Sequence, residues 1–122
     1  MSVLEGKIPG AGVTIPEVGI VVRNGTYVSY KNGGIWEKAL LQHEYGHILQ
    51  YRLVGQKAYY GVIAPLSLGS AIFNSSHNTF WIETWANHLS KGYFGSNWNN
   101  FGGYFGAQNI SPFNLLMLLR LR

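Results

Sequence analysis

The stretch His43-Glu44-Tyr45-Gly46-His47 constrains this chain more than any other feature, because it places two imidazoles four residues apart with a carboxylate between them. On an α-helix, positions four residues apart lie on one face, so both rings can converge on one metal ion. Glu44 lies roughly 100° around such a helix from His43, where its carboxylate flanks the metal and can take a proton from a bound water. The stretch therefore predicts a metal site on one helix face.

The residues around these histidines favour a helix over 36–53. This segment contains no proline, is rich in helix-forming residues and is followed by Gly55 as a stop signal. Apolar side chains recur at spacings of three, four and seven residues, which places the histidines on or beside an apolar stripe. Gly46 costs roughly 1 kcal/mol relative to alanine in a helix interior, so we expect a close approach to the backbone there. The more polar side is expected to carry Lys38, Gln42, Gln50 and Arg52. Two ordinary histidines on a structural helix are the alternative.

Glu83 is the predicted third ligand. A catalytic zinc ion usually takes three protein ligands and leaves a fourth position for water. Residues 79–89 are typical of a second helix, with candidate N-caps at Ser76 or Asn78 and stops at Gly92 or Gly95. The chain has no aspartate and only five glutamates. A carboxylate among the tryptophans and isoleucine of this helix is costly to bury unless it is paired or metal-bound, and an exposed helical glutamate is the alternative.

The HEYGH stretch and the downstream Glu83-Thr84-Trp85-Ala86-Asn87 together resemble the gluzincin arrangement of zinc metallopeptidases. In that family an HExGH helix supplies two histidine ligands, and a later helix with ExxAD supplies the glutamate. The resemblance covers roughly residues 36–92 and is closest to the small catalytic cores of bacterial and prenyl-protease-like metallopeptidases.

This resemblance implies that His43, His47 and Glu83 bind Zn²⁺. It also implies that Glu44 is the general base and acid. Asn87 stands where the family pattern has aspartate, at the position that orients a ligand histidine. An amide oxygen can still accept the hydrogen bond of that histidine but brings no charge, so zinc affinity or water activation is expected to be weaker.

The other two histidines are weighed as further site residues. His77 stands just before the second predicted helix, where a loop could bring it over the metal. In related zincins a histidine or tyrosine hydrogen-bonds the oxyanion of the tetrahedral intermediate, so the resemblance suggests this catalytic role for His77; an ordinary loop residue is the alternative. His88 lies about 140° around the helix from Glu83 and is expected to be structural. Weaker candidates for the oxyanion role are Tyr59, Tyr60 and Tyr93.

Composition bounds the domain organisation and the partners. At 122 residues the chain is predicted to be one compact zincin-like domain, 1–122, with a catalytic helical core at 36–92 and a Gly/Asn/aromatic-rich tail at 93–122. Charged residues make up 11% of the chain, against a usual quarter, which suits a module of a larger bacterial protein, a membrane-proximal protein or an oligomer. The net charge of +4 is dispersed and no nucleic-acid motif is present, so no nucleic-acid partner is expected. Absence of cysteine excludes thiolate zinc sites and leaves the compartment open.

Two segments bear on membranes and secretion. Residues 1–12 lack the pattern of a signal peptide. Residues 58–78 carry no formal charge, and 58–73 are strongly apolar, but glycine, proline and serine interrupt them. Their apolar run is shorter than the roughly 20 residues of a spanning helix, which favours a buried connecting segment over a membrane-seated hairpin beside the site.

The N-terminal third is predicted to be β structure. Residues 19–23 and 26–30 flank Asn24-Gly25, a strong hairpin signal because both turn positions need positive φ. Residues 13–15 could add a strand. In zincins a sheet edge beside the HExxH helix binds peptide as an additional strand, so the hairpin is either such an edge or purely structural.

The segment after Tyr93 alternates glycine, asparagine and aromatic residues without a helical or strand period. It is interpreted as an ordered loop over apolar surface or as a disordered linker. The apolar run 113–121 that follows would dock on the core, pair with another chain or touch a membrane.

These features predict an α+β fold, with an N-terminal β-hairpin or small sheet packed on the active-site helix and a second ligand-bearing helix. The predicted function is zinc-dependent hydrolysis of peptide or protein substrates, with a water activated by the metal and Glu44 as base. The alternatives are a metal-stabilised, catalytically silent binding or toxin-like module, and a membrane-associated protease. Localisation and oligomeric state stay open.

Overall fold

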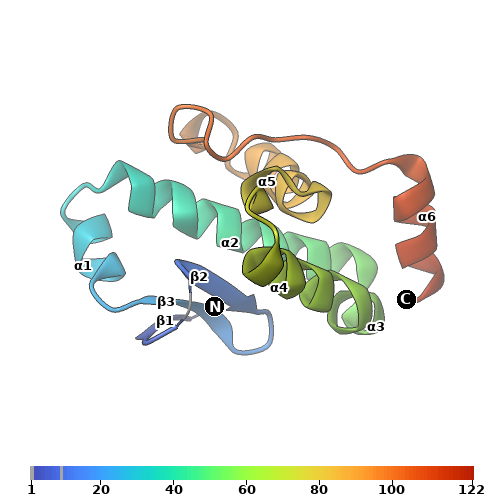
Figure 1. Ribbon diagram of the computed structural model, residues 1–122. Helices are drawn as coiled ribbons and strands as arrows, with labels where there is room; N and C mark the ends of the chain where they lie inside the picture. Colours follow the sequence, from blue (N-terminus) through green and yellow to red (C-terminus); the bar gives the residue numbers. More distant parts are fainter. Residues whose placement is uncertain (1, 9) are drawn as a thin grey trace.

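The computed structural model describes residues 2–8 and 10–122, so Met1 and Pro9 of the predicted N-terminal stretch lie outside it. The described residues form an α+β fold, as predicted, in which a small sheet lies beside a long central helix (Figure 1). This helix, α2, spans Ile35–Val54, and α5, Trp81–Phe94, packs along it. The two helices and the sheet together position the candidate site.

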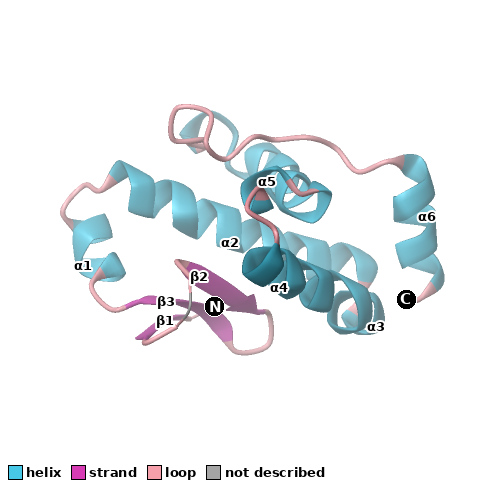
Figure 2. Cartoon of the chain, in the orientation of Figure 1, coloured by secondary structure: helices cyan, strands magenta, loops and turns pink. Residues whose placement is uncertain are grey.

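The sheet has three short strands, and Figure 2 shows them gathered on one side of α2. They are β1, Val3–Gly6; β2, Gly12–Ile15; and β3, Gly19–Arg23. β3 is central, parallel to β1 and antiparallel to β2, so β2 is an edge strand. Alternate side chains of β3, Ile20 and Val22, are buried in a cluster with residues of α2, which fixes the sheet against that helix.

The predicted hairpin at Asn24-Gly25 is wrong in its second half. Residues 19–23 form β3, but Thr26–Lys31 form a helix, α1, which follows Gly25 at a φ of 92°. Both edges of β3 are already paired, so residues 26–30 have no free edge of that strand to join. The hairpin that does form joins β2 to β3, and the Val18 amide donates to the Ile15 carbonyl over 2.8 Å at its turn.

The predicted helix over 36–53 is confirmed within one residue at each end. Gly55, at a φ of 88°, ends α2. The close approach expected at Gly46 is also confirmed: a Cβ placed there would lie 2.2 Å from the carbonyl oxygen of Ala86 in α5. The missing side chain lets α5 approach α2 within the turn that carries the histidines.

Residues 56–79 are mostly helical rather than a simple connecting segment. They form α3, Gln56–Ala58, a π-helical turn, Tyr59–Ile63, helix α4, Ala64–Phe73, and a 3₁₀ turn, His77–Thr79. The interpretation as a buried segment holds for Ala58, Tyr59, Ile63 and Ser70. It is wrong for one side of α4, where Leu66, Leu68, Ile72 and Phe73 are exposed. Over residues 2–8 and 10–122, no helix combines the length and apolar character needed to cross a membrane.

α5, Trp81–Phe94, begins two residues after the predicted helix 79–89 and ends five residues after it. Its N-cap is Phe80, because residues 77–79 form the separate 3₁₀ turn, so Ser76 and Asn78 do not cap it. Gly95, at a φ of 59°, ends the helix, and Gly92 lies inside it.

The tail after α5 lies on the core. A 3₁₀ turn, Gly95–Asn97, leads into a loop. This loop buries Phe105 in the apolar cluster that β3 forms with α2. The interpretation as an ordered loop over apolar surface is therefore confirmed. Helix α6, Pro112–Arg120, then buries Leu118 against the cluster formed with α3 and α5, so the apolar run docks on the core, although Phe113 and Leu116 of the same helix are exposed.

Candidate metal centre

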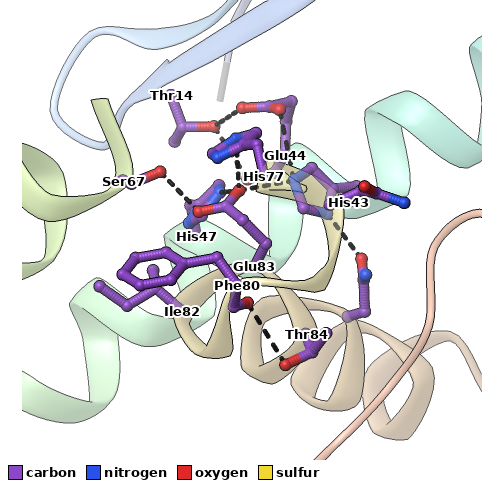
Figure 3. A network of polar contacts seen from close by, with 12 residues as sticks. Thr14, His43, Glu44, His47, Ser67, His77, Phe80, Ile82, Glu83 and Thr84 are labelled. Atoms are coloured by element: carbon purple, nitrogen blue, oxygen red, sulfur yellow. Dashed lines mark hydrogen bonds and ion pairs between the residues drawn. The ribbon is translucent and has the colours of Figure 1, made fainter. Parts of the chain in front are cut away.

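Five side chains from three elements converge beside the sheet. α2 supplies His43, Glu44 and His47, α5 supplies Glu83, and the 3₁₀ turn before α5 supplies His77. Figure 3 shows the three imidazoles directed at the Glu83 carboxylate. The group of His43, Glu44 and His47 is buried, and one ligand-capable atom from each lies within 4.8 Å of the other two. This group could hold a metal ion.

Glu83 completes the cluster from the neighbouring helix. Its Oε1 lies 3.1 Å from Nε2 of His43 and 3.1 Å from Nε2 of His47. The residue is 1% exposed, so the alternative of an exposed helical glutamate is wrong. Its Oε2 accepts a hydrogen bond from the Ser67 hydroxyl over 2.6 Å. Among the described residues its ionic partners are histidines and never lysine or arginine, so no fixed positive charge compensates this buried carboxylate.

The donor set fits a divalent metal ion. Atoms bound tetrahedrally to one zinc ion at the usual ligand distances lie roughly 3.3 Å from one another. The distances from Glu83 Oε1 to the nearby imidazole nitrogens, 3.1 to 3.4 Å, are of that size. Imidazole and carboxylate ligands suit zinc and also other first-row metals, so the donor set alone does not select the metal.

In the metal-free cluster the nearby carboxylates favour the protonated form of His43 and His47, at the place where a cation would bind. Burial lowers the pKa of His47, but the Glu83 carboxylate outweighs burial and raises that pKa to about 9. Burial also lowers the pKa of His43, but Glu83 and Glu44 outweigh burial and raise that pKa above its ordinary value. For Glu83 burial acts to raise the pKa, yet the two histidines hold it well below its usual range. The site therefore carries a buried anion that positive charge stabilises.

Amide side chains fix the orientation of both α2 histidines. Asn87 Oδ1 lies 2.6 Å from Nδ1 of His43, and the Asn87 amide nitrogen donates to the Gly106 carbonyl over 2.9 Å. Because that nitrogen must face a carbonyl, the oxygen faces the imidazole, and Nδ1 carries the hydrogen. The Nε2 lone pair of His43 is then directed at the site.

Gln50 does the same for His47. Its Oε1 lies 2.7 Å from Nδ1 of His47, and its nitrogen donates to the Ile82 carbonyl over 2.8 Å. Gln50 is fully buried and Gln42 is buried as well, so placing them on a polar side was wrong. The available signal for Gln50 was its position three residues after His47, on the same helix face.

Thr14 of β2 holds the Glu44 carboxylate. Its hydroxyl lies 2.8 Å from Oε1 of Glu44 and 2.9 Å from the Glu44 carbonyl oxygen. The other carboxylate oxygen, Oε2, lies 3.8 Å from Nε2 of His43. In the sequence Thr14 was predicted only as part of a strand, and no local pattern connects it to a residue thirty positions away.

His77 lies at the open side of the cluster. Its Nε2 is 3.4 Å from Oε1 of Glu83, its Nδ1 is 2.9 Å from the Ser70 hydroxyl oxygen, and its side chain is about one-third exposed. The remaining histidine, His88, is half-buried and makes no polar contact with the cluster among the described residues.

Of the three tyrosines that the sequence could not rank, the structure places one in the cleft. Tyr59 lies at the start of the π-helical turn, is 3% exposed and lines the cleft, while Tyr60 and Tyr93 do not. Its hydroxyl makes no hydrogen bond within residues 2–8 and 10–122. Burial, with Glu44 and Glu83, raises the pKa of Tyr59, so the phenol stays protonated. No buried side-chain nitrogen or oxygen of the described residues lacks a partner, so this unbonded hydroxyl is accessible from the cleft. A π-helical turn of this kind is frequent at functional sites.

The cluster lies at the base of a cleft of about 280 Å³. The edge strand β2 lines one wall with Gly12, Val13 and Thr14, and α4 lines another with Leu68. A Cβ at Gly12 would lie 3.3 Å from Cγ of Glu44, so the backbone of this strand passes close to the carboxylate.

No family model, no curated protein and no solved structure matches this chain. The functional argument therefore depends on the chemistry of the cleft.

Proposed function

We propose that this protein is a zinc-dependent peptidase in which His43, His47 and Glu83 hold the metal. The observation that carries the proposal is the buried Glu83 carboxylate, with one oxygen 3.1 Å from Nε2 of both histidines. The gluzincin-like order of the HEYGH and ExxAN motifs supports the same ligand set. Bound Zn²⁺ supplies Lewis acidity and lowers the pKa of a water molecule toward neutrality.

Glu44 is the proposed general base. The Thr14 hydroxyl engages Oε1, and Oε2 is the oxygen nearer His43, so the two oxygens have different surroundings. Oε2 takes the proton as water attacks the scissile carbonyl, and the same carboxyl returns it to the leaving amine.

His77 and Tyr59 are the proposed donors to the carbonyl oxygen as it becomes negative. Both line the cleft, on segments outside α2. Hydrogen-bond donors aimed at developing charge are worth several kcal/mol in a site that excludes water. Burial of Tyr59 and the nearby carboxylates, which raise its pKa, keep its hydrogen available for donation.

An extended peptide or protein segment is the proposed substrate. The β2 edge is not paired with another strand in the described sheet, and its residues line the cleft beside Glu44. A peptide added along that edge receives backbone hydrogen bonds with little dependence on its sequence. Trp36, Leu40 and Phe105 also line the cleft, which favours apolar side chains next to the bond that is cut.

Glu44→Gln tests the proposal. The substitution keeps the shape and the acceptor for Thr14 but cannot take a proton, so we expect zinc content to persist and peptide cleavage to fall by at least about 100-fold. Cleavage by the variant at the parental rate would show that Glu44 is not the base. A parental protein that binds zinc but cleaves no member of a diverse peptide library would count against the peptidase as a whole.

A second candidate is a metal-stabilised, catalytically silent module, favoured by the position of His77. Its Nε2 lies 3.4 Å from Glu83 Oε1, close enough to the cluster for His77 to act as a fourth ligand. His77→Gln separates the two functions. In the silent module the substitution lowers zinc affinity strongly, whereas in the peptidase it leaves affinity nearly unchanged and lowers turnover.

A further inference from the structure

The ring nitrogen of His77 that is farther from the cluster, Nδ1, takes part in a series of hydrogen bonds that the proposed reaction does not use. This nitrogen lies 2.9 Å from the hydroxyl oxygen of Ser70, a buried residue of α4. The side-chain nitrogen of Asn74 donates to the same oxygen over 3.3 Å. We call this series, Asn74 to Ser70 to His77, the His77 relay.

The relay has a direction because the orientation of Asn74 is fixed. Its side-chain oxygen accepts the backbone N–H of Ser76 over 2.9 Å, which leaves the nitrogen to face Ser70. The Ser70 oxygen therefore receives a hydrogen bond, and its own hydrogen needs an acceptor, since an unpaired buried hydroxyl costs about 1–3 kcal/mol. Within the described residues the acceptor in reach is His77 Nδ1. Ser70 donates to it, and a neutral His77 then carries its hydrogen on Nε2.

This tautomer is the opposite of the one found at the other two imidazoles. When their rings are neutral, His43 and His47 donate from Nδ1 to amide oxygens and direct Nε2 lone pairs at the cluster. His77 accepts at Nδ1 and directs an Nε2 hydrogen at it. The three imidazoles around Glu83 Oε1 thus differ in their roles. Two can bind a metal ion through Nε2, and the third can donate a hydrogen bond from Nε2.

We propose that Ser70, oriented by Asn74, holds His77 in the Nε2–H tautomer, so that His77 faces the cleft as a hydrogen-bond donor and not as a metal ligand. Ser70 is a positioning residue, which acts through His77 alone. The inference rests on the proposed peptidase, because a donor at this place has a use when a carbonyl oxygen gains negative charge there.

The tautomer can be measured without an activity assay. Two-bond ¹H–¹⁵N correlation spectra of the zinc-loaded protein at pH 8 show which ring nitrogen of each histidine carries the hydrogen. His77→Gln identifies the signals of His77 among the four histidines. We expect the hydrogen on Nε2. A hydrogen on Nδ1, or zinc on Nε2, would overturn the proposal.

Two substitutions change the relay in opposite ways. Ser70→Ala removes the donor to Nδ1, so the spectrum should show a mixture of tautomers. Asn74→Asp keeps an oxygen for the Ser76 N–H but replaces the amide donor with an acceptor; the Ser70 hydroxyl then turns toward it, and His77 should shift to the Nδ1–H form. Asn74 is exposed, so this variant should fold even if Ser70→Ala does not.

Conservative and neighbouring substitutions serve as controls. Ser70→Thr keeps the hydroxyl and should keep the Nε2–H form, and Ser75→Ala, at an exposed serine of the same loop, should leave the spectrum unchanged. If Asn74→Asp leaves the hydrogen on Nε2, the relay does not set the tautomer.

Turnover separates failure of the relay from failure of the peptidase. With a cleaved peptide, Ser70→Ala should lower kcat roughly tenfold or more while KM and zinc content stay close to the parental values. A parental Nε2–H form without cleavage of any peptide would contradict the proposed function and support the relay as a structural device. Cleavage together with an Nδ1–H form would contradict the relay and leave the peptidase in place.

Discussion

Gly46 and Ala86 meet where α2 and α5 approach, and a Cβ on Gly46 would lie 2.2 Å from the Ala86 carbonyl oxygen. Gly46 is the residue before His47, and Ala86 lies three residues after Glu83. The absence of one side chain on α2 therefore determines how near the Glu83 carboxylate can come to the two imidazoles.

Gly46→Ala should weaken metal binding although alanine is the better helix former. The gain in helix propensity is about 1 kcal/mol, but the added methyl forces α5 away from α2, and overpacking of this kind costs about 1–3 kcal/mol. We expect lower thermal stability and at least tenfold weaker zinc binding in a competition titration with a chromogenic chelator. Gly92→Ala in α5 is the matched control, because nothing lies within 4 Å of a Cβ there. This control should stabilise the protein slightly and leave its zinc affinity unchanged. A zinc affinity of Gly46→Ala equal to that of the parental protein would contradict the role of the helix contact.

The metal-free protein should be more stable at pH 6 than at pH 9. Burial lowers the pKa of His47, but Glu83 outweighs it and raises the folded-state pKa to about 9, against an ordinary value of 6.5. A group with a raised folded-state pKa contributes its full stabilisation below the unfolded pKa and loses it as pH rises through the folded value. The difference corresponds to roughly 3 kcal/mol in the free energy of unfolding. Urea unfolding in the presence of a chelator at both pH values measures it.

Two controls accompany this pH measurement. If His47 is a zinc ligand, as proposed, zinc must replace its proton, so zinc affinity should increase over the same pH range. His47→Gln should remove most of the pH dependence of the metal-free protein. Equal stability of the metal-free parent at pH 6 and pH 9 would show that His47 does not hold a proton through Glu83.

Gln50→Leu should lower zinc affinity roughly 10- to 100-fold, the usual effect of removing the partner that orients a ligand histidine. Gln50 accepts from His47 and donates to the Ile82 carbonyl, so the variant also loses some stability. Gln42→Leu is the comparison, since Gln42 is also buried in α2 but bonds the backbone of Asn97 and Asn99 instead of a histidine. It should lose stability without losing zinc affinity. Equal affinity losses in both variants would indicate general destabilisation.

Tyr59→Phe should lower kcat by roughly 10- to 100-fold with little change in zinc content or melting temperature. The hydroxyl has no hydrogen-bond partner within the described chain, so its removal leaves no protein group unpaired. Tyr60→Phe, at the next residue and outside the cleft, should leave turnover unchanged. Steady-state kinetics on a cleaved peptide measure kcat for each variant. A kcat of Tyr59→Phe equal to the parental value would exclude the Tyr59 hydroxyl as a donor to the substrate.

The sequence was most informative where local pattern and chemistry coincide. His43 and His47 belong to one helix whose period and stop signal are local, so α2 could be predicted nearly to the residue. Glu83 could be singled out because carboxylates are scarce in the chain and this one stands among apolar residues. Gly46 indicated a close contact before its partner was known.

The sequence was least informative where distant segments meet. The pairing of β3 with β1 leaves no edge for residues 26–30, and no turn signal at Asn24-Gly25 reveals that competition. Thr14 reaches Glu44 from a separate strand. Gln50 looks polar in the sequence, and its burial is favourable only because His47 and the Ile82 carbonyl satisfy both ends of its amide.

The loop after α5 has a consequence for the order of assembly. Asn87, which orients His43, is itself held by the Gly106 carbonyl, and the Phe105 ring lies 5.2 Å from the His43 ring. A chain still emerging from the ribosome would present both α2 histidines and Glu83 well before this loop is available. Firm capture of a metal ion would then wait until residues 105 and 106 have been synthesised and close over the histidine.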